Sequence, residues 1–217
     1  MGYYTILNEA RDEFEEKKSE FIGSIKRVYS EDEAKKFIAK VRNEFKDARH
    51  NVYAYIIGEN KGIQRYSDDG EPQGTGGIPV LEVIKKNDVT DVVVVVTRYF
   101  GGILLGTGGL ARAYSKGASI AIKKANIVEK VKGKELQIII DYDMLGKIQY
   151  TFGQKAWHIE NIDYSDKVKL VFRCELDKLN KVQSVVRELT SGAGVIVSSD
   201  EKYYFKGEEK LFEDREN

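Results

Sequence analysis

The sequence predicts an α+β protein built from two parts of different composition. Ten of its 20 glycines lie between Gly70 and Gly117, whereas the region after residue 132 has the composition of an ordinary globular domain. Five consecutive valines at 92–96 do not alternate with polar residues, which is typical of a strand buried on both faces. The second half shows the order strand, helix, strand, strand, helix, strand. We therefore expect two domains that combine helices with sheets, over residues 1–132 and 133–217.

In the first half, apolar patterns predict strands over residues 3–7, 19–27, 51–57 and 91–98. A helix is expected after Ser30, because Ser30 and Glu33 form a capping box in which their side chains satisfy exposed amides. Its buried face would carry apolar residues at three-and-four spacing, namely Ala34, Phe37, Ile38, Val41 and Phe45. Further helices are predicted over 78–86 and 106–125. Pro79 fits the first turn of the shorter one, where an amide would have no partner.

The second half predicts a regular βαββαβ unit. Its strands are expected at residues 135–142, 159–165, 167–175 and 195–205, and its helices at residues 144–157 and 179–191. This is the ferredoxin-like plan, in which two helices cover one face of an antiparallel sheet. The polar step Lys132-Gly133-Lys134 is predicted to join the two halves.

The charge of the chain is balanced overall but not locally. Its 35 basic and 35 acidic residues cancel, with a pI near 6.8, which argues against a protein that coats nucleic acid or membranes through bulk charge. The segment from Arg98 to Lys132 nevertheless holds seven basic residues and one acid, Glu129. This local excess of positive charge suits an anionic partner.

Three observations predict a cytoplasmic protein without a membrane span. The single cysteine, Cys174, excludes an intrachain disulfide framework and gives a thiolate metal site no companion ligand nearby. The longest apolar run, the five valines, is far too short to cross a bilayer. Charged residues near the N-terminus interrupt any signal-peptide core. We expect no cofactor and no metal ion.

The unusual part of the chain is a pair of glycine-rich segments, at residues 65–79 and 97–109. Glycine weakens regular elements by roughly 0.5–1 kcal/mol relative to alanine, so this density indicates positive φ angles or the close approach of a backbone or ligand. The second segment leads directly into a helix, whose free N–H groups form a natural anion site. The predicted site for a phosphate of RNA or of a nucleotide comprises Arg65, Arg98, Gly101, Gly102, Gly106, Thr107, Gly108, Gly109, Arg112 and Lys116.

Arg98 and Arg112 are expected to flank the bound anion, one from the end of the valine strand and one from the first turns of the helix. The alternative is that the glycines only let this helix pack closely on the sheet. Two nucleotide-binding motifs do not fit. The P-loop lysine is missing after Gly106, and no acid that could bind a ribose follows Gly106 and Gly108 at the required distance.

Asp68, Asp69 and Glu71 are the candidate catalytic residues. Three carboxylates this close together can bind magnesium or act as acid and base. Asp-Asp-Gly-Glu-Pro is also typical of a tight surface turn, which is the interpretation we favour. The two histidines, His50 and His158, lie one in each half, and neither forms a recognisable catalytic set. The sequence thus favours a non-catalytic protein and leaves an enzyme open.

At these residues the chain resembles the IMPACT/YigZ family. The likeness rests on Arg65-Tyr66-Ser67-Asp68-Asp69-Gly70-Glu71-Pro72 with Gly74-Thr75, on Thr97-Arg98-Tyr99-Phe100-Gly101-Gly102, and on Leu105-Gly106-Thr107-Gly108-Gly109-Leu110 with Arg112-Ala113-Tyr114. Upstream blocks also match, at Lys17-Lys18-Ser19 with Phe21-Ile22 and at His50-Asn51 before Tyr53-Ala54-Tyr55. The resemblance covers essentially the whole chain.

The resemblance implies a fold for each half. The N-terminal half would be similar to the second domain of small-subunit ribosomal protein five and to domain IV of elongation factor G. The C-terminal half would be ferredoxin-like and similar to domain V of that factor. The second implication agrees with the order of elements above, whereas the first rests on the resemblance alone.

The resemblance also implies a role in translation regulation. Eukaryotic relatives act by competing for an activator of a starvation-responsive kinase, and nucleic-acid or ribosome binding is proposed for bacterial members from their fold. We therefore expect a non-catalytic protein that binds RNA or the ribosome. A protein-interaction module is the alternative, followed by an enzyme acting on a phosphorylated or peptide substrate. Family members commonly carry cations where Ile78 and Leu104 stand here, which removes two charges from the rim of the predicted site.

Overall fold

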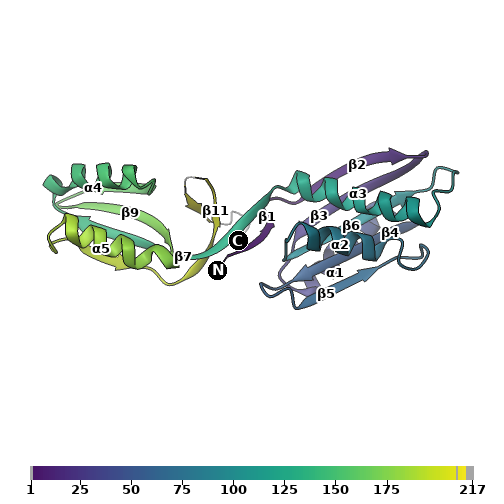
Figure 1. The fold of residues 1–217 in the computed structure, drawn as a ribbon, viewed down its shortest axis with the longest axis horizontal. Coiled ribbons are helices and arrows are strands. Elements are labelled where there is room, and N and C mark those ends of the chain that lie inside the picture. Colours follow the sequence, from purple (N-terminus) through teal and green to yellow (C-terminus); the bar gives the residue numbers. More distant parts are fainter. Residues whose placement is uncertain (1, 209, 214–217) are drawn as a thin grey trace. The chain divides into compact units, whose positions relative to one another are not determined.

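The computed structural model describes residues 2–208 and 210–213, which form two compact units (Figure 1). One unit spans Tyr3–Val128, and the other contains Gly2 and the residues from Glu129 onward. Both units combine helices with strands, so the expected mixture of the two is confirmed. Within the described ranges, no helix has the length and apolar character that a membrane crossing requires.

An antiparallel sheet with the strand order β2-β3-β6-β4-β5 forms the centre of the first unit. Its central strand holds the valines at 92–96, which are all completely buried, as the sequence predicts. Their side chains alternate between two apolar cores, one on each face of the sheet. The strands of this unit are β1 (Tyr3–Ile6), β2 (Ala10–Glu16), β3 (Ser19–Arg27), β4 (His50–Ile57), β5 (Ile63–Ser67) and β6 (Val92–Tyr99).

Helices pack against both faces of this sheet (Figure 1). α1 (Glu31–Glu44) shares a core with Val93 and Val95, whereas α2 (Gly77–Lys86) and α3 (Thr107–Ala125) share the core of the opposite face. The predicted cap of α1 is present, because Ser30 Oγ accepts a hydrogen bond from the Glu33 amide at 3.2 Å. The long α3 follows the central strand β6 in the chain, and the loop at residues 100–106 connects the two.

α3 meets β3 at a contact between two glycines. A Cβ placed on Gly23 would stand 2.1 Å from the carbonyl oxygen of Gly117, and a Cβ on Gly117 would stand 2.7 Å from a methyl group of Val96. Only residues without a side chain allow two backbones to come this close. At this contact, glycine serves helix–sheet packing.

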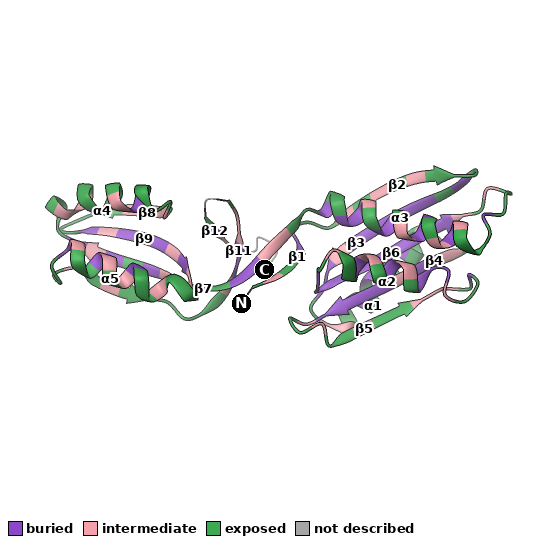
Figure 2. Ribbon diagram, in the orientation of Figure 1, coloured by how far each residue is buried: buried purple, intermediate pink, exposed green. Residues whose placement is uncertain are grey.

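The second unit has the predicted order of elements, confirmed as β7-α4-β8-β9-α5-β10. The neighbouring strands are antiparallel and lie in the order β10-β7-β9-β8. Figure 2 shows buried residues concentrated along β7 and β9, and these pack with α4 and α5 into one apolar core. The elements are β7 (Ile127–Ile140), α4 (Tyr142–Gln154), β8 (Ile159–Tyr164), β9 (Val168–Glu175), α5 (Leu179–Leu189), β10 (Val195–Ser198), β11 (Lys202–Lys206) and β12 (Leu211–Phe212).

The structure corrects three details of the predicted elements. β2 and β5 were not predicted, because they are edge strands with mostly polar residues and little apolar alternation. The predicted step at Lys132-Gly133-Lys134 is absent, since β7 runs through it and pairs there with β11 and then with β9. The single strand expected at 195–205 is divided into β10 and β11.

Candidate functional site

The first glycine-rich segment is a loop held in place by its own acids. Asp68 Oδ1 accepts hydrogen bonds from the amides of Gly76 at 2.9 Å and Gly77 at 2.8 Å, and Oδ2 accepts one from Gly74 at 2.9 Å. This carboxylate caps α2 from outside the helix, because the N-cap residue Gly76 has no side chain. These three amides are occupied by Asp68, so this segment does not offer them to a ligand.

Asp68 makes the stability of the first unit sensitive to acid. Burial raises the pKa of its carboxyl, but the amides of Gly74, Gly77 and Gly76 outweigh burial and hold the pKa below its ordinary value. A carboxyl of this kind stabilises the fold above its unfolded-state pKa of about 3.9 and loses that contribution as the pH falls through its folded-state pKa.

We expect Asp68→Asn to lower the free energy of unfolding by about 1 kcal/mol at neutral pH, and this difference to shrink as the pH falls below about 4. Urea unfolding at several pH values, with hydrogen–deuterium exchange of the α2 amides as the readout, measures the stability difference and its dependence on pH. Asp47, an exposed aspartate of the same unit, provides the control as Asp47→Asn. A cost of Asp68→Asn that does not change with pH would contradict the assigned role.

Asp69 ties the loop to β4 and α1. Its carboxylate accepts a hydrogen bond from the Asn51 amide at 2.7 Å and pairs with Arg42. Its carbonyl oxygen lies 2.9 Å from His50 Nδ1. Asp69 has a φ of +46°, a left-handed conformation that aspartate tolerates in turns. Both aspartates thus have hydrogen-bond partners within the fold.

Glu71 is buried with Arg98 and Tyr114. Glu71 Oε1 accepts hydrogen bonds from Arg98 Nη1 and from the Tyr114 hydroxyl, each at 2.7 Å. The Glu71 and Arg98 side chains are only 4% and 7% exposed. Burial first, and then the nearby carboxylate, raise the pKa of Tyr114 far above its ordinary value, so its hydroxyl remains a donor. This cluster joins the loop to β6 and α3.

The structure places Arg98 inside the first unit and not on the rim of a surface site. Its guanidinium carbon lies 5.6 Å from the ring centroid of Phe21 and 5.4 Å from that of Phe100. Its Nε–H has no hydrogen-bond partner among the described residues. Because Glu71 supplies its counter-ion, the predicted convergence of Arg98 and Arg112 on one external anion is not what the structure presents.

Gly101 allows the chain to pass closely over the β2–β3 hairpin. A Cβ on Gly101 would stand 1.8 Å from the carbonyl oxygen of Lys18, and the Gly101 amide donates a hydrogen bond to Ser19 Oγ at 3.1 Å. Lys17 and Lys18 form the hairpin turn, with left-handed φ angles of 49° and 62°. The contact brings the hairpin lysines beside the loop that leads into α3.

The second glycine-rich segment ends at an exposed helix N-terminus. α3 begins after Gly106, which has a φ of +72°, and its first turn contains no acid and receives no side-chain cap. Leu110 closes the first backbone hydrogen bond onto Gly106. The amides of Thr107, Gly108 and Gly109 have no acceptor in the part of the chain that the structure describes. These are the free amides that an anion site at a helix N-terminus uses.

A pocket of about 200 Å³ lies beside this end of α3, and we call it the cationic pocket. It is lined by residues of the β2–β3 hairpin, of α3 and of the loop before it, namely Phe14, Glu16, Lys17, Leu105, Gly109, Arg112, Ala113 and Lys116. Lys116 Nζ lies 4.1 Å from the centroid of the Phe14 ring. Within the described ranges, Lys17, Arg112 and Lys116 form no ion pair with a carboxylate. Three cations and one acid therefore face the pocket.

The cationic pocket contains only part of the predicted site. Gly109, Arg112 and Lys116 line it, and Gly101, Gly102, Gly106, Thr107 and Gly108 belong to the loop and helix start beside it. Arg65 does not line it; it is exposed on β5, with Nε 3.5 Å from Glu31 Oε1. Phe14 and Lys17 were missed as members of an anion site, because they belong to a hairpin whose first strand was not predicted.

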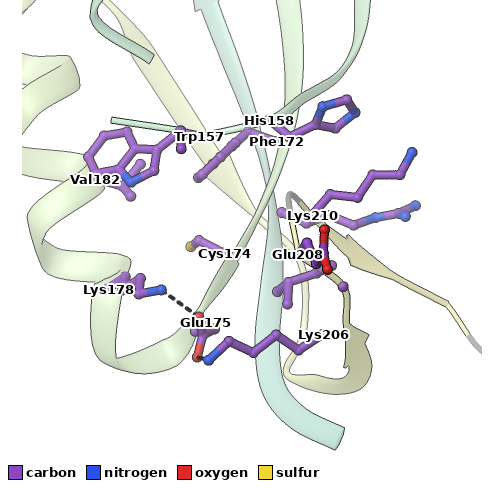
Figure 3. A pocket seen from close by; sticks show the side chains of 14 residues that line it. Trp157, His158, Phe172, Cys174, Glu175, Lys178, Val182, Lys206, Glu208 and Lys210 are labelled. Carbon is purple, nitrogen blue, oxygen red and sulfur yellow. Dashed lines mark hydrogen bonds and ion pairs between the residues drawn. The ribbon is translucent and has the colours of Figure 1, made fainter. Parts of the chain in front are cut away.

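A second pocket, of about 120 Å³, lies within the other unit (Figure 3). In Figure 3, Cys174 lies between the aromatic Trp157 and the ion pairs of Glu175. Burial raises the pKa of the Cys174 thiol to about 11, so the thiol is neutral at physiological pH. Glu175 accepts hydrogen bonds from Lys178 at 2.5 Å and from Lys206 at 3.2 Å. Two lysines of this pocket are therefore already paired, in contrast to those of the cationic pocket.

The chain is similar to known proteins over most of its length. The Impact N-terminal domain matches residues 17–122, and a domain of unknown function (DUF1949) matches residues 138–193. The chain is 40% identical over 205 residues to IMPACT family member YvyE of Bacillus subtilis (strain 168), covering 94% of each chain. It is 34% identical over 187 residues to IMPACT family member YigZ of Escherichia coli (strain K12), covering 85% of this chain and 92% of that relative.

A solved structure supports the same relationship. A crystal structure described as that of a hypothetical protein superposes with a TM-score of 0.59 at 31% identity, and the match covers 92% of this chain and 98% of the other. Because the similarity to the bacterial relatives extends over nearly their whole length, the chain belongs to the IMPACT family.

Proposed function

We propose that this protein is a non-catalytic, cytoplasmic RNA-binding factor with a role in translation regulation, and that ribosomal RNA is among its targets. The observation that carries the proposal is the cationic pocket. It combines Lys17, Arg112 and Lys116, which have no carboxylate partner among the described residues, with Gly109, one of the three residues at the start of α3 whose amides are free. Unpaired cations beside helix amides favour a phosphate, the group that RNA presents along its whole length.

The strand order of the second unit and the partners of the three acids also support this proposal. The strand order β10-β7-β9-β8 with two helices agrees with a ferredoxin-like second unit. The expected likeness of the two halves to domains IV and V of elongation factor G would place such a protein on the ribosome. In addition, Asp68, Asp69 and Glu71 have partners inside the fold, which counts against their use as an acid–base set.

The proposal is tested by measuring RNA binding as a function of salt. We expect fluorescence anisotropy to show binding of a labelled RNA oligonucleotide, and transfer RNA and ribosomal RNA to compete with it. Binding should weaken steeply between about 50 and 200 mM salt, because each neutralised phosphate releases counterions. Arg112→Ala and Lys116→Ala should each weaken binding and reduce the magnitude of the negative slope of log K against log salt by about 0.7 for a single strand.

Lys123→Ala is the matched control for Lys116→Ala. Lys123 lies in the last turn of the same helix, is exposed and does not line the cationic pocket. Both variants remove one positive charge from α3, so only binding at the cationic pocket predicts unequal effects. Absence of RNA binding at low salt, or equal losses in the two variants, would refute the proposed function.

A further inference from the structure

Apolar side chains are exposed beside the cationic pocket. Leu104 is 81% exposed, Phe100 47% and Ile103 42%, and all three lie in the loop between β6 and α3. This loop begins at the β2–β3 hairpin, where Gly101 bonds to Ser19, and it ends at Leu105, which lines the pocket. The same short segment therefore joins an apolar surface to a cationic one.

Phe100 is held by a charged group of the interior. The guanidinium carbon of Arg98 lies 5.4 Å from the Phe100 ring centroid, and Arg98 is itself held by Glu71. Because about half of Phe100 remains exposed, the ring has support from the protein and still presents surface to solvent. A supported ring of this kind is a stacking platform for a base, and such stacking does not depend on the base sequence.

The two surfaces together discriminate between forms of RNA. A pocket of about 200 Å³ with three cations accommodates a single phosphate group and not the side of an RNA double helix. In a duplex the bases stack on one another and the backbone is the accessible part, so the apolar loop would gain nothing from contact. In a single strand, bases can leave the stack and lie on aromatic or aliphatic side chains.

We infer that this site binds single-stranded RNA, with one phosphate in the cationic pocket and a neighbouring base on Phe100 and Leu104. The inference rests on the proposed function and narrows it to one form of RNA. Lys17, Arg112 and Lys116 bind the phosphate, whereas Phe100, Ile103 and Leu104 contact the base. Charge and apolar contact are therefore separate contributions that separate variants can remove.

The experiment compares one labelled RNA oligonucleotide, free and annealed to its complement, at the same salt concentration. We expect wild-type protein to bind the single strand at least about tenfold more tightly than the duplex. Phe100→Ala should weaken single-strand binding by about tenfold with little change for the duplex, and Leu104→Ala should weaken it by a smaller factor in the same direction. Neither variant should change the salt dependence, because neither side chain contacts a phosphate.

Ile63→Ala is the control, because Ile63 is an exposed apolar residue of the same unit that lies on β5. Leu104→Ala guards against misfolding, since a side chain so exposed contributes little to the core. Equal affinity for the two forms of RNA, or unchanged single-strand binding in both Phe100→Ala and Leu104→Ala, would overturn the inference and leave the proposed function standing. Binding of neither form by wild-type protein at low salt would overturn both.

Discussion

Replacing Glu71 with glutamine is expected to lower the free energy of unfolding of the first unit by about 3–5 kcal/mol. Glu71 and Arg98 are almost completely buried, and Glu71 is the carboxylate that pairs with Arg98. Without the negative charge, the guanidinium remains in the interior with no counter-ion, and its desolvation is no longer offset. Hydrogen–deuterium exchange of the β6 amides in urea measures this loss in the first unit alone.

Glu82→Gln is the matched control for this experiment. Glu82 also pairs with a cation, Lys85, at 3.0 Å, but both side chains are exposed, so the cost should stay below about 1 kcal/mol. The double variant Glu71→Leu with Arg98→Met should be less destabilised than Glu71→Leu alone, because it leaves no unpaired charge in the core. Similar costs for Glu71→Gln and Glu82→Gln would show that the buried pair does not hold the loop.

Replacing Gly23 with alanine is expected to destabilise the first unit by about 3 kcal/mol, the upper end of the usual cost of overpacking. The added Cβ would stand 2.1 Å from the carbonyl oxygen of Gly117. That neighbour is backbone and cannot move aside as a flexible side chain would. α3 must therefore shift away from β3, which loosens the apolar core that the two elements share. The same exchange measurement on the β6 amides gives the change in stability.

Gly108→Ala is the appropriate comparison. It is also a glycine-to-alanine change, but it lies in α3 at a position where a Cβ has room. The nearest atom to a Cβ there is Arg112 Nη1 at 3.8 Å, so the substitution should leave stability unchanged or raise it by up to about 1 kcal/mol. If Gly23→Ala is as well tolerated as Gly108→Ala, the close crossing of α3 over β3 is not required for the fold.

Elements whose signals are local could be predicted from the sequence. β6 was recognised from its uninterrupted valines and α1 from Ser30 and Glu33, since burial on both faces and helix capping leave a pattern within a few residues. β2 and β5 escaped because each lies at an edge of the sheet and carries mostly polar side chains. Their strand conformation comes from hydrogen bonds to a neighbouring strand, and the residue pattern within each segment does not predict this pairing.

The candidate site likewise contains residues that local sequence predicts and residues that only the folded chain brings together. The free helix start at Gly106 and the cations Arg112 and Lys116 were predicted, because they lie in one segment of the chain. Arg98 was misplaced because its partner lies 27 positions away, and the glycine-rich pattern carries no information about that distance. Lys17 was missed as a member of the site for a related reason, since only the folded β2–β3 hairpin brings it to α3.

The sequence by itself determined the class of fold, the buried central strand, the order of elements in the second unit and the exposed glycine-rich start of α3. These depend on hydrophobic periodicity, capping and the conformational freedom of glycine, which act over a few residues. The tertiary structure alone decided that Asp68 closes the start of α2 and that Glu71 neutralises Arg98. A charge near a glycine-rich turn can serve the fold or a ligand equally well, and the choice depends on which distant group reaches it when the core packs.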